Sequence, residues 1–275
     1  MYVRRYTGKI NMVVFDTAGT VCDGPQDLRH RWPEDDLRGS KAPVVPFYEV
    51  LKNHGIIISW SVIRQPMGMY KPDHLRYLLN LPEVKSQYIS TYGHDYTEKE
   101  FEIMVDEFKS LLLKYCIDDD LAKPVEGALN CINDLRGAEI IIGSDTGYFD
   151  NISKLLNKKL EDRFNLCFDV ATNAEIVQGR PSPCMVFDCM SKAKVWPVES
   201  VVKVDDTAAG VLSGNNAGCW TIGLYASGSN DYNKLAAAKP DFLIPTIARV
   251  PDIIFGQIEP MLRRGGRPGQ DLIEI

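Results

Sequence analysis

The chain has 275 residues, of which 45% are hydrophobic and 25% charged, so it can bury a sizeable core and is not expected to be disordered. Its formal net charge of -6 excludes the overall basic footprint of a dedicated nucleic-acid-binding protein, although a local basic site would still accept a small anion. Seven cysteines without a CxxC pair favour a reducing compartment and argue against a zinc site. The first apolar run is too short for a signal peptide or a membrane span, so we expect a cytoplasmic protein with no membrane or nucleic-acid partner.

Short apolar runs, many of them rich in β-branched residues, recur along the chain and predict buried parallel strands at 10–15, 140–143, 168–171, 201–204, 221–224 and 242–244. Amphipathic stretches lie between the later runs and predict helices at 125–135, 149–156, 183–193 and 208–217. This alternation of strand and helix predicts an α/β fold with a Rossmann-like, doubly wound parallel sheet.

The alternation is broken after the first strand by about a hundred residues that look mostly helical. We interpret 26–117 as an inserted helical cap, with 1–25 and 118–265 forming the core domain. The charged opening of the cap, 27–40, has no periodicity and is expected to be a loop. The Gly-rich end, 266–275, is expected to be a flexible tail.

Acidic residues stand at the predicted carboxyl ends of two strands. Asp16 ends the first strand, and the small residues 17–20 after it form a turn whose backbone amides can approach a phosphoryl group. Asp205 and Asp206 follow the strand SVVKV. Acids from two strands can share one Mg²⁺ ion, which prefers oxygen ligands and would relieve the repulsion between an anionic substrate and Asp16. On the first loop alone, a carboxylate that caps a turn is the alternative.

A third strand ends in polar residues that can also bind an anion. Ser144 and Thr146 offer hydroxyl groups to phosphate oxygens, and Arg180, in the sequence QGRPSP just before a helix, offers a guanidinium. A surface arginine would be the simpler interpretation if Arg180 stood alone.

These four motifs, DTAGTVCD, GSDTGY, GRPSP and VDDTAAG, resemble in order and spacing those of the haloacid dehalogenase superfamily. The resemblance implies that Asp16 is a nucleophile that attacks phosphorus, and that the amides of Ala18, Gly19 and Thr20 bind the phosphoryl group. It also implies Mg²⁺ bound by Asp16, the backbone carbonyl of Ala18, Asp206 and, less directly, Asp205. Most phosphatases of the superfamily have a second Asp where this chain has Ala18, so a simple phosphate-ester hydrolase is less expected.

The predicted cap contains a lysine, Lys71, whose amine could act as a nucleophile. Lys71 directly precedes Pro72 and Asp73, a pairing typical of the first turn of a helix. The positive end of the helix dipole would lower the pKa of its amine and favour the neutral form that attacks a carbonyl. His74 would share a helical face with Lys71 and could transfer protons or bind the substrate. A solvated surface lysine is the alternative.

The sequences PMGMYKPDH, GSDTGY and QGRP are similar to those of the phosphonoacetaldehyde hydrolase family, and this likeness covers most of the chain. It implies that Lys71 forms a Schiff base with the substrate aldehyde, that Met67 and His74 line the site, and that Tyr148 lies beside Thr146. A protonated imine would let the carbon-phosphorus bond break to a neutral enamine, while Asp16 accepts the phosphoryl group. The family also implies a homodimer formed through cap helices.

Three features depart from that family. Gly210 replaces a second acid of the last motif, the loop at 27–40 is longer, and Tyr70 and Lys41 stand where other residues are common. Two other functions therefore stay open. One is a phosphohydrolase for another small phosphonate or phosphate, in which Lys71 only binds the anion. The other is a weakly active or inactive scaffold that binds a partner.

Overall fold

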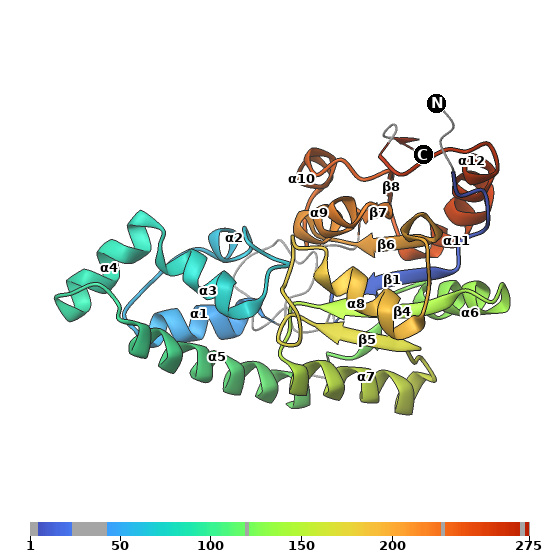
Figure 1. Cartoon of the computed structure of the whole chain (residues 1–275). Coiled ribbons are helices and arrows are strands. Elements are labelled where there is room, and N and C mark those ends of the chain that lie inside the picture. Colours follow the sequence, from blue (N-terminus) through green and yellow to red (C-terminus); the bar gives the residue numbers. More distant parts are fainter. Residues whose placement is uncertain (1–4, 24–42, 119–120, 227–228, 270–272, 275) are drawn as a thin grey trace.

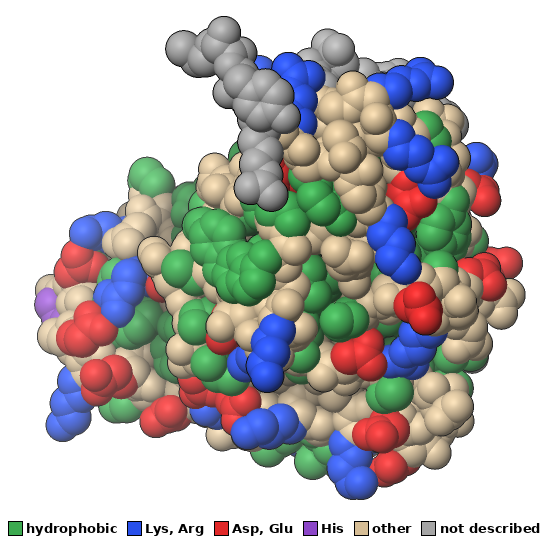
Figure 2. All heavy atoms as spheres, turned by 45° about the vertical axis from the view of Figure 1, so that its right-hand side comes forward, with side chains coloured by type: hydrophobic (Ala, Val, Ile, Leu, Met, Phe, Trp, Pro, Cys, Tyr) green, Lys and Arg blue, Asp and Glu red, His purple; other side chains and the backbone are tan. Residues whose placement is uncertain are grey.

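The computed structural model describes residues 5–23, 43–118, 121–226, 229–269 and 273–274 (Figure 1). The charged loop expected at 27–40 and Lys41 lie outside the described residues. Within them, no helix is both long and apolar enough to cross a membrane. Figure 2 shows basic and acidic side chains intermixed on one face of the molecule.

A parallel sheet of seven strands forms the core, in the order β5-β4-β1-β6-β7-β8-β9. Its strands are β1 (Met12–Asp16), β4 (Ile141–Thr146), β5 (Val170–Asn173), β6 (Val201–Asp205), β7 (Trp220–Leu224), β8 (Phe242–Ile244) and β9 (Ile273–Glu274). β1 lies between β4 and β6, with Asp16 in register with Asp145 of β4. The strand order reverses across β1, and this is where ligands bind in such sheets. The predicted doubly wound α/β fold is confirmed.

Alternate residues of β1 face opposite helical layers, as the period of a strand requires. Met12 and Val14 pack in a cluster with residues of α8 (Cys184–Ala193), whereas Val13 and Phe15 belong to the larger core cluster with residues of α6 (Ala128–Gly137). The other core helices are α7 (Asp150–Phe164), α9 (Ala208–Ala217), α10 (Tyr232–Ala237), α11 (Val250–Ile253) and α12 (Glu259–Arg263). η2 (Val198–Ser200) and η3 (Ile247–Arg249) are turns of 3-10 helix, and η4 (Ile254–Ile258), between α11 and α12, is π-helical.

A second group of helices extends to one side of the sheet (Figure 1). It consists of α1 (Val44–Asn53), α2 (Trp60–Ile63), α3 (Lys71–Leu79), α4 (Pro82–Tyr92) and α5 (Glu98–Asp118). Stacked rings of Phe47 and Phe108, with centroids 4.1 Å apart, help to pack α1 against α5. The chain enters and leaves the group beside a short antiparallel ladder of β2 (Cys22–Asp23) and β3 (Lys123–Pro124).

The end of the chain differs from the expected flexible tail, because β9 pairs in parallel with β8 at the edge of the sheet. The backbone N–H of Gly269 donates to the side chain of Asp241, which precedes β8. This bond ties the Gly-rich segment to the core before β9 begins.

Candidate active site

The loop after β1 is closed by its own backbone. The carbonyl of Thr17 accepts hydrogen bonds from the N–H groups of Val21 and Cys22, and the N–H of Gly19 donates to the carbonyl of Cys22. Gly19 has a φ of 100°, and a Cβ there would overlap the carboxylate of Asp206. Glycine is therefore needed for both the turn and its close contact with the end of β6.

Five buried charged side chains form a network of ion pairs at the carboxyl ends of β1, β4 and β6. Nη2 of Arg180 donates to Asp16 Oδ1 at 2.6 Å, to the carbonyl of Asp145 at 3.0 Å and to Asp145 Oδ1. Nζ of Lys203 lies 2.7 Å from Asp145 Oδ1 and 2.8 Å from Asp205 Oδ2. Each carboxylate thus contacts at least one cation, as charges buried in a protein require.

The pKa values of the acids differ with their neighbours. Burial raises the pKa of Asp16 well above its usual range, and although Arg180 opposes this, Asp205 and Asp206 add to it. Burial also acts to raise the pKa of Asp205, but Arg180 and Lys203 outweigh it and hold that pKa below its ordinary value. Burial and the charge of Asp205 raise the pKa of Asp206 to about 6. The strand ends therefore hold more negative charge than their cations balance.

This surplus charge fits a divalent cation. Among the described core residues, Asp16, Asp145, Asp205 and Asp206 lie beside two buried cations, Arg180 and Lys203, which leaves a formal surplus of two negative charges if all four acids are ionised. Oδ1 of Asp206 accepts one hydrogen bond, from Thr20 at 3.0 Å, so it retains a lone pair.

The ligands expected from the sequence, Asp16, Asp206 and the carbonyl of Ala18, offer oxygen atoms of the kind that a hard divalent cation binds, and this ligand set stays a prediction. Carboxylate oxygens of Asp16, Asp145 and Asp205 also lie within 4.8 Å of one another, but Arg180 and Lys203 stand among them.

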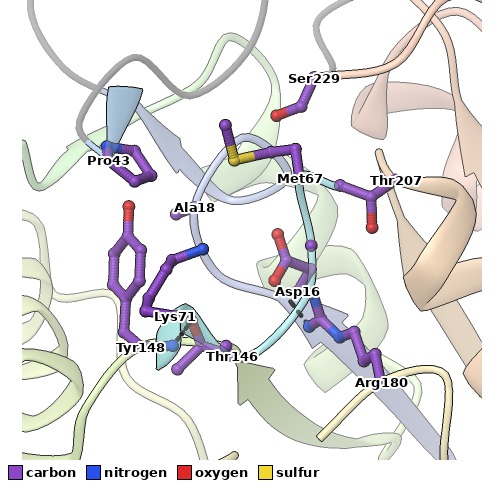
Figure 3. A pocket seen from close by; sticks show the side chains of 12 residues that line it. Asp16, Ala18, Pro43, Met67, Lys71, Thr146, Tyr148, Arg180, Thr207 and Ser229 are labelled. Atoms are coloured by element: carbon purple, nitrogen blue, oxygen red, sulfur yellow. Dashed lines mark hydrogen bonds and ion pairs between the residues drawn. The ribbon is translucent and has the colours of Figure 1, made fainter. Parts of the chain in front are cut away.

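A small cavity of about 20 Å³ lies over Asp16, between the core and the helices that follow β2 (Figure 3). The described residues that line it are Asp16, Ala18, Pro43, Met67, Gly68, Lys71, Thr146, Gly147, Tyr148, Arg180, Thr207 and Ser229. This volume holds about one water molecule. Within the described residues, the helical group and the core therefore line the space over Asp16 together and leave little free volume there.

Lys71 is the first residue of α3, and its side chain points into the cavity between Tyr148 and Asp16 (Figure 3). It is 3% exposed, and its Nζ lies 5.1 Å from the ring centroid of Tyr148 and 3.5 Å from the carbonyl of Met69. Burial is the main cause that lowers the pKa of Lys71 to about 8; Asp16 acts in the opposite direction, and Arg180 lowers it further. The direction agrees with the sequence-based expectation, which rested on the helix dipole instead of burial.

His74 is fully buried and is not among the lining residues. Its Nε2 lies 2.7 Å from the carbonyl of Ile63, so Nε2 is the protonated nitrogen, and its ring centroid lies 4.1 Å from that of Phe47. Burial, followed by the charge of Lys71, holds the pKa of His74 well below its usual range. Nδ1 meets no hydrogen-bond partner among the described residues. The structure thus places His74 as a neutral ring outside the lining, and its expected proton transfer stays a prediction.

The other residues selected from the sequence fall into two groups. Met67, Thr146 and Tyr148 line the cavity with Ala18 and Arg180. Ser144, Gly19, Thr20, Asp205 and Asp206 lie outside the lining, where the hydroxyl of Ser144, for example, lies 2.8 Å from that of Thr17.

Asp145 and Lys203 belong to the site although neither was predicted from the sequence as a site residue. A lysine in the middle of the apolar strand SVVKV was the available signal, because a buried ammonium needs a carboxylate partner. Thr207 and Ser229 also line the cavity and were not predicted; Thr207 is the N-cap of α9, and Ser229 lies in the loop between β7 and α10.

Comparison with known proteins agrees with this architecture. A family described as haloacid dehalogenase-like hydrolase matches residues 10–218. A phosphonoacetaldehyde hydrolase from Syntrophobacter fumaroxidans is 32% identical, covering 96% of this chain and 97% of that protein. Another, from Bacillus cytotoxicus, is 31% identical and covers 80% of this chain and 78% of that protein. The crystal structure of a phosphonoacetaldehyde hydrolase-like protein from Oleispira antarctica has a TM-score of 0.86 at 23% identity, covers 98% of this chain and 99% of its own, and shows the same fold.

Proposed function

The chain belongs to the haloacid dehalogenase-like hydrolases and, among them, to the phosphonoacetaldehyde hydrolase family, and on this premise we propose that it cleaves the carbon-phosphorus bond of phosphonoacetaldehyde with the help of Mg²⁺. The products are acetaldehyde and phosphate. One observation carries the proposal: Lys71 and Asp16 line the same small cavity, together with Arg180. A carboxylate that can attack phosphorus and an amine that can attack an aldehyde thus line one small space.

The proposed reaction begins at Lys71. Its neutral amine attacks the aldehyde carbon, and the resulting carbinolamine takes up one proton and loses water to give a protonated imine. A carboxylate oxygen of Asp16 then attacks phosphorus, and the electrons of the carbon-phosphorus bond move into the imine to give an enamine. Water hydrolyses the aspartyl phosphate to phosphate, while the enamine takes up a proton and is hydrolysed to acetaldehyde, which restores Lys71.

The remaining residues bind the phosphoryl group. Arg180 offers a buried guanidinium, and the N–H of Ala18 and the hydroxyl of Thr146 are further candidate donors because both residues line the cavity. The N–H of Gly19 donates to the carbonyl of Cys22 instead. When bound, a Mg²⁺ ion at the oxygens of Asp16, Ala18 and Asp206 would offset the repulsion between the phosphonate and the attacking carboxylate. Ala18 cannot protonate a leaving oxygen, and the proposed reaction needs no acid there because the enamine leaves uncharged.

A second candidate is a phosphohydrolase in which Lys71 only binds an anion. It is favoured by one observation, namely that a pKa of about 8 leaves most of the amine protonated near neutral pH. Asp16, Arg180 and Mg²⁺ would then suffice for phosphoryl transfer to water, and the substrate would need no aldehyde. A homodimer formed through the cap and a cytoplasmic location stay predictions under either function.

The test measures acetaldehyde release from phosphonoacetaldehyde with Mg²⁺, with and without borohydride, followed by mass mapping of any reduced adduct. Turnover that borohydride stops, with an adduct on Lys71, is the expected result. Lys71→Arg keeps the charge and removes the nucleophilic amine, so it should abolish both turnover and the adduct. Asp16→Asn should form the adduct without releasing phosphate. Turnover by Lys71→Arg that borohydride does not affect would refute the imine and leave the phosphohydrolase.

A further inference from the structure

Asp145 is a buried acid that the proposed reaction does not use. It is fully buried in β4 and is the register partner of Asp16 in β1, so the two side chains leave neighbouring strands at the same position. Two carboxylates so placed repel each other in a buried site unless a cation lies between them. Nη2 of Arg180 is that cation, since it contacts Oδ1 of both acids.

The contacts of Arg180 are concentrated on one nitrogen. Nη2 binds the side chain of Asp16 and both the carbonyl and the side chain of Asp145, whereas the buried Nε meets no hydrogen-bond partner among the described residues. Asp145 therefore fixes one end of the guanidinium. The rest of that plane stays available to bind an anion over Asp16.

Asp145 is itself held from the other side by Lys203. Nζ of this fully buried lysine lies 2.7 Å from Asp145 Oδ1 and 2.8 Å from Asp205 Oδ2. Asp205 is fixed in turn by the N–H and hydroxyl of Thr207, at 2.9 and 2.7 Å. These contacts form a chain of alternating charge from α9 to Arg180, and it gives the Asp145 carboxylate a single position.

We propose that Asp145 is a positioning residue for the phosphoryl-binding guanidinium of Arg180, with Lys203 as the counter-ion that holds it. Asp145 acts through Arg180 and does not touch the substrate. The inference rests on the proposed phosphoryl chemistry at Asp16. It adds a buried acid-lysine pair to the residues on which that chemistry depends.

A thermodynamic cycle with Asp145→Asn and Arg180→Ala tests this, with affinity for inorganic phosphate in the presence of Mg²⁺ as the first measurement. Loss of one negative charge would by itself tighten the binding of an anion. The proposal requires the opposite, a weakening of about 10-fold, because the guanidinium is no longer held in place. The double variant should bind phosphate no more weakly than Arg180→Ala alone, since the acid acts only through the arginine.

Asp241→Asn is the matched control, because it also removes a buried carboxylate but one that contacts Thr221 at the edge of β7. It should leave phosphate affinity unchanged. Asp145→Ser provides a second removal of the acid, and thermal unfolding shows whether each variant folds. Phosphate binding that is unchanged or tighter in the folded Asp145 variants, or additive losses in the cycle, would overturn the proposal. Failure of both variants to fold would assign Asp145 to folding and overturn it as well.

The same variants are then compared in kcat and KM for phosphonoacetaldehyde. A fall in kcat of about 10- to 100-fold is expected for Asp145→Asn. Phosphate binding does not depend on which substrate the enzyme uses. If the wild-type protein fails to hydrolyse phosphonoacetaldehyde, the proposed function fails, and the phosphate cycle still decides the role of Asp145.

Discussion

Replacing Lys71 with methionine is expected to stabilise the protein while abolishing its proposed activity. Lys71 is 3% exposed, and burial is the main cause that lowers its pKa from the ordinary 10.5 to about 8. That difference corresponds to about 3 kcal/mol of stability that the folded state loses by burying the ammonium. Methionine has a similar length and no charge, so Lys71→Met should recover much of this energy.

The stability that Lys71→Met gains over the wild type should decrease as the pH rises. The folded state releases the proton of Lys71 at a lower pH than the unfolded state, so the wild-type protein gains stability as pH rises from about 8 to about 10.5. The advantage of Lys71→Met should therefore be about 3 kcal/mol near pH 7 and about 1.5 kcal/mol near pH 9.5. Urea unfolding at both pH values measures it.

Lys154→Met, at a side chain that is 75% exposed, is the control and should change stability by about 0.5 kcal/mol or less at either pH. An advantage of Lys71→Met that does not change with pH, or a variant less stable than the wild type near pH 7, would refute the reasoning.

Two further predictions concern the seating of the cap. A Cβ at Gly147 would lie 2.5 Å from the carbonyl oxygen of Met69, so Gly147→Ala should separate the cap from the core and lower kcat/KM by about 10-fold or more. Gly137→Ala is the control, because a Cβ there meets open space and should leave kcat/KM unchanged. Equal kinetics of the two variants would contradict this prediction. Nζ of Lys234 donates a hydrogen bond to the carbonyl of Gln65 at 2.6 Å. Lys234→Met should therefore speed amide hydrogen exchange of residues 65–70 and have little effect on the free energy of global unfolding. Unchanged exchange at 65–70 would show that this bond does not hold the cap.

The positions of the strands follow from the sequence because their apolar, β-branched runs are buried on both faces. The end of β4 does not follow in this way. Its apolar run stops at Gly143, but the strand continues to Thr146, and Asp145 and Thr146 pair with β5. Polar residues are tolerated in this buried strand because the charges and hydroxyl groups of the site bind them, and no local pattern reports such distant partners.

The candidate site was predictable where a sequence motif indicates the chemical role of a residue, as it does for Asp16, Lys71 and Arg180. All three line the cavity. The role of Asp145 was not predictable, because it depends on the register in which β1 pairs with β4. Only the pairing of β1 with β4 places it beside Asp16, and only then is a shared cation required. The helical spacing of His74 from Lys71 follows from the sequence, but the packing of its ring on Phe47 outside the lining does not, and its catalytic role stays a prediction.

The arrangement of charges separates the chemistry into two parts. The core fixes Asp16 and Arg180 through contacts that involve no cap residue, so the phosphoryl site is organised before the cap closes. The cap contributes Lys71, whose pKa depends first on burial, and that burial exists only when the cap is seated. An open cap would expose the amine to water and raise its pKa toward the ordinary value, so that imine formation is favoured only in the closed state. Phosphate affinity should therefore survive changes in the cap that abolish imine formation, because closure controls the amine and leaves the guanidinium in place.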